Sequence, residues 1–103
     1  MPADIVAAID LGSNSFHMIV ARMVNGHFQI LDRLREMVQF AAGLDGKNRL
    51  SEESQLRALD CLARFGQRLR HIPPEQLRIV GTNTLRQARN SAEFLVRAEA
   101  VLG

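Results

Sequence analysis

The sequence predicts an α/β fold with a mixed sheet and the element order β-β-β-α-β-α. Two apolar runs, residues 5–10 and 16–24, flank a turn of small polar residues. Apolar residues recur at helical spacing after Ser51, and a short apolar run at 77–81 follows that helix. A helix of about five turns is long enough for this run to return parallel to an earlier strand by a right-handed crossover. The sheet therefore combines antiparallel and parallel pairs.

The first half of the chain predicts three consecutive antiparallel strands. Residues 5–10 are almost continuously apolar, which is typical of a strand buried on both faces. The run at 16–24 ends at Asn25-Gly26, a strong signal for a type I′ hairpin, in which both turn residues need a positive φ. Residues 27–36 are then the return strand.

A long helix is predicted after an unassigned segment at 37–42 and an exposed loop at 43–49. Ser51 is the expected N-cap, and acidic residues follow it where the helix dipole favours them. Pro73 and Pro74 end the helix after Ile72. Its apolar positions are Leu56, Leu59, Leu62, Ala63, Gly66 and Leu69.

A second helical region follows the strand at 77–81. Residues 82–84 mark its start, and Asn90 with Glu93 three residues later resembles a capping box for the last helix. The apolar face of that helix consists of Phe94, Leu95, Ala98 and Leu102.

Length and composition indicate one ordinary globular domain. The chain has 103 residues, of which 47% are hydrophobic and 23% charged, and no apolar run approaches the ~20 residues of a membrane span. Its single cysteine, Cys61, falls within the helical pattern and is expected to be a packed residue rather than a nucleophile. One cysteine and three scattered histidines exclude a zinc cluster. With no secretory leader, a cytoplasmic location is expected, and peripheral association with a membrane stays open.

The charge pattern suits a polyanionic substrate. The net charge is +2, and of the 13 basic residues only Lys47 is a lysine. Arginine offers a planar fork for phosphate oxygens. Nucleic acid is not an expected partner, because the aromatic residues that stack on bases are only 5% of the chain and all are Phe. The arginines at 57, 64, 68 and 70 are expected to be spread around the long helix as solvated residues, without forming a stripe.

The segment from Asp10 to Ser15 has a layout suited to phosphate. Gly12 has no Cβ to hold a ligand away, and Ser13, Asn14 and Ser15 offer hydroxyl and backbone N–H donors. Asp10 would lie beside the phosphate, where Mg²⁺ is held by one or two carboxylates, phosphate oxygens and water. The alternative is a simple hairpin whose aspartate accepts turn hydrogen bonds.

Two motifs resemble a known family. Residues Asp10 to His17 resemble the first phosphate loop of the exopolyphosphatase/guanosine pentaphosphate phosphohydrolase family, a branch of the actin, hexokinase and heat-shock chaperone ATPase superfamily. Residues 80–90 are similar to a second segment of that family, and residues 50–53 resemble its helix start. The resemblance implies a ribonuclease-H-like (actin-like ATPase) half-domain that is incomplete at its C-terminal side. Residues 1–103 are then the N-terminal phosphate-binding subdomain of a longer exopolyphosphatase-like enzyme.

The resemblance also implies a reaction, the hydrolytic release of the terminal phosphate of inorganic polyphosphate or guanosine pentaphosphate with Mg²⁺. Asp10 is the implied metal ligand and Arg86 the implied phosphate clamp. The other implied substrate-binding residues are Gly12, Ser13, Asn14, Ser15, Thr82, Asn83 and Thr84. The general base implied by the family is a glutamate beyond residue 103, which neither Glu93 nor Glu99 matches, so the chain alone is expected to be inactive.

Other outcomes stay open at this point. A non-catalytic phosphate-binding or assembly module of the same fold, or a kinase of the same superfamily, would carry similar loops. We expect a homodimer, because an incomplete half-domain leaves an edge or a helix face uncovered. His17 is expected to be packed or hydrogen-bonded, and Arg89 to be solvated.

Overall fold

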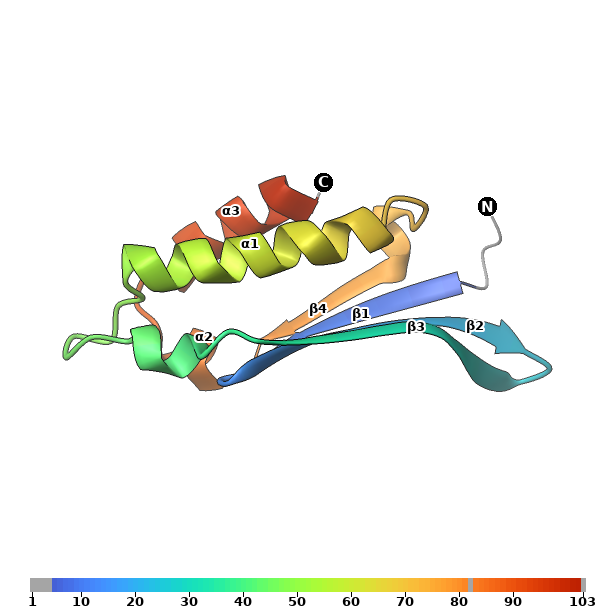
Figure 1. The fold of residues 1–103 in the computed structure, drawn as a ribbon, viewed down its shortest axis with the longest axis horizontal. Helices are drawn as coiled ribbons and strands as arrows, with labels where there is room; N and C mark the ends of the chain where they lie inside the picture. Colours follow the sequence, from blue (N-terminus) through green and yellow to red (C-terminus); the bar gives the residue numbers. More distant parts are fainter. Residues whose placement is uncertain (1–4, 82, 103) are drawn as a thin grey trace.

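One four-stranded sheet carries two helices on a single face (Figure 1). The computed structural model describes residues 5–81 and 83–102, with only the backbone of Asn83. The predicted element order is confirmed, with one short extra helix before the last one. In chain order the elements are β1 (Ile5–Leu11), β2 (Ser15–Val24), β3 (His27–Met37), η1 (Phe40–Gly43), α1 (Glu52–Arg68), η2 (Pro74–Gln76), β4 (Leu77–Gly81), α2 (Asn83–Gln87) and α3 (Ser91–Leu102).

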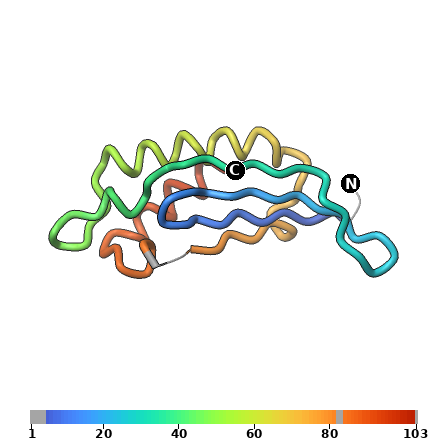
Figure 2. The backbone as a smooth tube through the Cα atoms, turned by 60° about the horizontal axis from the view of Figure 1, so that its bottom comes forward, coloured from blue at the N-terminus to red at the C-terminus, as the bar shows by residue number. Residues whose placement is uncertain are grey.

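The first three strands form an antiparallel meander, as predicted. β1 pairs with β2, and β2 pairs with β3. Asn25 and Gly26 have φ values of 50° and 81°, the two positive values that a type I′ turn requires. A register shift between Val20 and Ala21 interrupts the second ladder, and the hairpin of β2 and β3 extends beyond the helices (Figure 2).

β4 pairs with β1 in parallel, which gives the sheet order β3-β2-β1-β4. The register ends with Leu11 opposite Gly81. Because parallel strands end at the same edge of a sheet, the turn after β1 and the segment after β4 leave the sheet side by side. This topology brings together two segments that are about 70 residues apart in the sequence.

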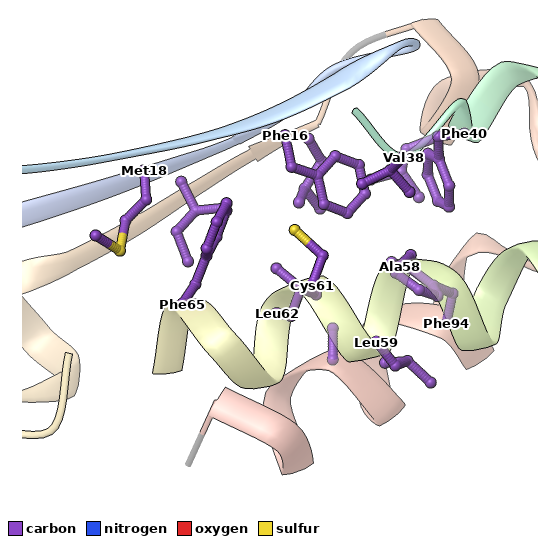
Figure 3. Close-up of a cluster of buried hydrophobic side chains, with 14 of the residues drawn as sticks. Phe16, Met18, Val38, Phe40, Ala58, Leu59, Cys61, Leu62, Phe65 and Phe94 are labelled. Atoms are coloured by element: carbon purple, nitrogen blue, oxygen red, sulfur yellow. The ribbon is translucent and has the colours of Figure 1, made fainter. Parts of the chain in front are cut away.

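The core lies between the sheet and the two helices. Phe16, from β2, packs against Phe40, whose ring also contacts Phe94 of α3; both pairs of ring centroids are 5.2 Å apart. From α1, Cys61 and Phe65 project into the same layer (Figure 3). Cys61 is fully buried, so its expected packing role is confirmed. Burial raises the pKa of its thiol to about 12, which keeps the group neutral.

The opposite face of the sheet has no helix over it in the described chain (Figure 1). The expectation that β1 is buried on both faces is therefore wrong: Ala8 and Asp10 are exposed, whereas Ile9 and Leu11 are buried. A short apolar run does not distinguish burial on one face from burial on two. His17 lies opposite Asp10 in the register of β1 and β2 and is exposed, so of the two expected roles, packed or hydrogen-bonded, the packed one is wrong.

The start of α1 is as predicted, but its end is not. Ser51 Oγ accepts from the backbone N–H of Ser54, so Ser51 is the N-cap. The helix ends at Arg68, not at Ile72. After Arg68 the Leu69 N–H donates to the carbonyl of Gly66, which forms a tighter turn. Of the expected apolar positions, Leu56 and Ala63 are exposed.

Three arginines form a row along α1 facing β3. Arg57 donates to the carbonyl of Val38, Arg64 Nε donates to Glu36 at 2.7 Å, and Arg68 pairs with Asp32 at 2.9 Å. The expectation of arginines without a stripe is wrong for these three, because spacings of seven and four residues fall on one face of a helix. The Arg64 guanidinium holds the pKa of Glu36 below its ordinary value.

Candidate functional site

The structure joins two of the predicted phosphate-binding segments by a direct contact. Thr84 Oγ1, in α2, donates to Ser13 Oγ, in the turn after β1, at 2.9 Å across 71 residues of sequence. Thr84 is only 3% exposed, which fixes its hydroxyl beside the turn. The contact follows from the parallel register of β1 and β4, whose ends place both segments at one edge of the sheet.

The turn after β1 is tight and has a fixed orientation. A Cβ on Gly12 would lie 2.6 Å from the Ser15 carbonyl oxygen, so glycine is required there by close approach. The carbonyl of Ser13 accepts from the N–H of Ala41, and that of Asn14 accepts from the N–H groups of Val38 and Gln39, all at 2.8 Å. In a trans peptide the N–H points opposite to the C=O. The N–H groups of Asn14 and Ser15 therefore point away from residues 38–41.

The side chains of this turn differ in accessibility. Asn14 is exposed, Gly12 and Ser13 are half-buried, and Ser15 is buried. The N–H of Asn14 has no hydrogen-bond partner among the residues that the structure describes. The turn thus presents the backbone N–H of Asn14 and the half-buried Ser13 hydroxyl at the surface. Donors of this kind bind phosphate oxygens.

The segment after β4 contributes α2, a helix of five residues. Thr82 lies outside the described residues, as does the side chain of Asn83, so their predicted roles have no structural counterpart here. Arg86 is exposed and, with Leu11, Leu85 and Glu99, lines a hollow of about 370 Å³ between the end of β4 and α3. Arg86 makes no hydrogen bond or ion pair with another described side chain, which leaves its guanidinium available.

The predicted metal ligand lies next to the turn. Asp10 is exposed near the end of β1, opposite His17 of β2 and Val80 of β4. No group of three His, Cys, Asp or Glu side chains within residues 5–81 and 83–102 could hold a metal ion. A single carboxylate fits Mg²⁺, which keeps several waters and is completed by substrate phosphates, better than a metal that needs a full protein cage.

Asn90 has a different role from the predicted one. Its side chain does not form a capping box but pairs with the backbone of Leu50, where Oδ1 accepts from the N–H at 2.9 Å and Nδ2 donates to the carbonyl at 3.1 Å. Glu93 is exposed. No local pattern could have indicated this pairing, because the two residues are 40 positions apart.

Known proteins of one family resemble the chain. Residues 19–103 match the model of the Ppx/GppA phosphatase family. The chain is 52% identical over 97 residues to a guanosine-5'-triphosphate,3'-diphosphate pyrophosphatase of Vibrio cholerae serotype O1, which covers 94% of this chain and 20% of the relative. The chain thus spans about a fifth of the length of this curated relative.

Solved structures support the same assignment. An exopolyphosphatase-like protein superposes with a TM-score of 0.87 at 29% identity, over 96% of this chain and 30% of the other. An exopolyphosphatase from Cytophaga hutchinsonii gives 0.86 at 26% identity, over 95% and 31%. The PPX-GPPA enzyme of Aquifex aeolicus gives 0.86 at 26% identity, over 99% and 34%. The described elements are thus part of the actin-like fold of these proteins, and the chain belongs to the Ppx/GppA phosphatase family.

Proposed function

We propose that the chain forms the phosphate-binding part of a hydrolase that releases the terminal phosphate of guanosine pentaphosphate or inorganic polyphosphate. The observation that carries this proposal is the contact between Ser13 and Thr84, which joins two donor-bearing segments at one edge of the sheet. The relatives, a guanosine pentaphosphate pyrophosphatase and exopolyphosphatases, supply the substrate class.

The residues of the site suit binding and charge stabilisation. The backbone N–H of Asn14 and the Ser13 hydroxyl would bind oxygens of the terminal phosphate. Arg86 would hold the same phosphate by two parallel hydrogen bonds from its guanidinium. Asp10 would hold Mg²⁺, which neutralises charge on the phosphate oxygens when bound. Phosphoryl transfer depends mainly on such positioning, because little covalent chemistry is left for the protein.

The water-activating carboxylate is proposed to lie outside residues 1–103. Glu36 and Glu52 are each paired with an arginine, and Arg64 and Arg97, respectively, lower their pKa values. Glu99 lines the same hollow as Arg86, but mostly apolar side chains surround it there. Neither arrangement provides a free base next to the turn after β1.

A chimera tests the proposal in a complete enzyme. Residues 5–102 of this chain would replace the matching segment of the Vibrio cholerae relative, and phosphate release from guanosine pentaphosphate and from polyphosphate would be measured with and without Mg²⁺. We expect turnover that falls at least tenfold in Ser13→Ala, which removes the hydroxyl, in Asp10→Asn, and in Arg86→Lys, which keeps the charge but loses the fork. Arg89→Ala is the matched control, because its exposed side chain lies close in sequence to Arg86. Equal turnover of the chimera and all three variants would overturn the assignment.

Further expectations belong to the same proposal. A cytoplasmic location fits the free and buried thiol of Cys61. None of the described helices is long and apolar enough to cross a membrane. A homodimer and the absence of a nucleic-acid partner are likewise proposed, and light scattering with an electrophoretic shift assay would test them.

A further inference from the structure

The connection between β3 and α1, residues 38–50, touches both halves of the candidate site. At its first end the N–H groups of Val38, Gln39 and Ala41 donate to the carbonyls of Asn14 and Ser13. These bonds fix the peptide planes of the turn after β1 and so direct the Asn14 and Ser15 N–H groups away from the connection. The connection thereby sets the orientation of the first donor segment.

The other end of the connection holds the segment that follows α2. The N–H of Arg89 donates to the carbonyl of Asn48 at 2.7 Å. The side chain of Asn90 pairs with both the N–H and the carbonyl of Leu50, as a neighbouring strand would. Ala88 is buried, and its N–H donates to the carbonyl of Thr84. This bond connects α2 directly to Arg89 and Asn90, the two residues that bind the connection.

The connection is itself well braced. Leu44 and Leu50 form an isolated antiparallel bridge, and the Asp45 carboxylate accepts from the N–H groups of Lys47 and Arg49, which hold its pKa below the ordinary value. From α1, Gln55 Nε2 donates to the Leu50 carbonyl at 3.2 Å. The connection is therefore suited to transmit a fixed distance between its two ends.

These contacts close a ring. It runs from the turn after β1 through residues 38–50 to Asn90, back along α2 to Thr84, and across the hydrogen bond to Ser13. Only a side-chain amide fits the Asn90 position, because it offers a donor and an acceptor side by side, whereas a carboxylate offers acceptors alone and alanine offers neither.

We propose that Asn90 is a positioning residue that sets the spacing of the two phosphate-binding segments by tying α2 to the connection at residues 38–50. This inference rests on the proposed function for its consequence in binding. The structural part, the coupling of the segment after α2 to the turn after β1, stands on the hydrogen bonds alone.

The test compares Asn90→Ala and Asn90→Asp with the wild-type chain, and uses Ala98→Gly as the control. Ala98 is buried in α3, the helix that follows Asn90. Glycine at this position weakens α3 but leaves the hydrogen bonds between Asn90 and Leu50 in place. Backbone hydrogen exchange, measured by NMR without ligand, follows the N–H groups of Val38, Ala41 and Arg89. Titration with sodium tripolyphosphate, in the presence of Mg²⁺, gives the dissociation constant.

In Asn90→Ala we expect exchange at these three amides to accelerate about tenfold more than in Ala98→Gly. The dissociation constant for tripolyphosphate should also rise about tenfold, because the variant loses both side-chain hydrogen bonds to Leu50. Asn90→Asp keeps an acceptor for the Leu50 N–H but places a carboxylate oxygen against the Leu50 carbonyl, so both measurements should change in the same direction as in Asn90→Ala. If exchange in both Asn90 variants is no faster than in Ala98→Gly, the coupling is refuted. If exchange accelerates but wild type and Asn90→Ala bind tripolyphosphate equally, the positioning role is refuted. If wild type binds no tripolyphosphate, the proposed function of this chain fails, while the exchange measurement still decides the coupling.

Discussion

Replacing Gly12 by alanine should damage the site through a backbone clash. The added Cβ would lie 2.6 Å from the Ser15 carbonyl oxygen, whereas ordinary contact begins at 3.4 Å. The carbonyl must therefore move by about 0.8 Å, the difference between these distances. Such overpacking costs about 1–3 kcal/mol of stability, and each kcal/mol lowers the Tm of a domain of this size by about 4–8 °C. The shift would also disturb Asn14, whose carbonyl accepts two hydrogen bonds.

Gly46 offers a matched control for this substitution. A Cβ at Gly46 meets no atom within 4 Å, and its φ lies outside the left-handed region. Gly46→Ala should leave stability unchanged or raise it by up to about 1 kcal/mol, because alanine restricts the unfolded chain. Unfolding in urea, followed by far-UV circular dichroism because the chain has no Trp or Tyr, measures both variants. Equal stability of Gly12→Ala and Gly46→Ala would refute the close-approach reasoning.

Three further outcomes test the energetics and the chemistry. Because Arg64 lowers the pKa of Glu36 from 4.5, their ion pair stabilises the fold above about pH 4.5 and stabilises it less as the pH falls. Glu36→Gln should therefore lower the free energy of unfolding by up to ~1 kcal/mol at pH 7 and by less at pH 3. An equal loss at both pH values contradicts this. Because burial raises the pKa of Cys61 from 9.0 to about 12, its contribution to stability should decline as the pH rises from 9 to 12. Iodoacetamide at pH 8 should label Cys61 only in urea, and rapid labelling of the native chain would contradict this burial. The 103-residue chain should fold but release no phosphate from polyphosphate with Mg²⁺, because a positioned general base contributes ~10²–10⁴-fold; release that Asp10→Ala abolishes would show that the chain contains its own base.

Local signals predicted the elements whose cause is local. The Asn25-Gly26 turn and the Ser51 cap each depend on residues within four positions, and the structure has both. The parallel return of β4 was also predictable, since a strand, a helix and a strand in one sheet restrict the topology. That single pairing determines which two segments meet, so the contact between Ser13 and Thr84 agrees with the motifs read from the sequence.

Expectations failed where a residue's partner lies far along the chain. The helical spacing puts Arg64 and Arg68 on one face of α1, but it does not reveal that this face meets Glu36 and Asp32 of β3, which lie 28 and 36 positions away. Likewise, which face of β1 is covered depends on where α1 and α3 pack, and the apolar run at residues 5–10 does not encode that choice.

Asn90 shows why the support of a site is harder to predict than the site itself. Residues that bind a ligand are limited by chemistry to a few types, so a Gly-Ser-Asn turn after a strand already indicates phosphate. A supporting residue is limited only by geometry, and Asn90 has an equally good local role as the cap of α3, where its carbonyl accepts from Phe94. Its side chain pairs instead with Leu50, which is buried and whose N–H bonds to Asn90 Oδ1 in the described chain. An unpaired buried N–H costs about 1–3 kcal/mol, more than a helix cap typically contributes. The nonlocal demand therefore outweighs the local one.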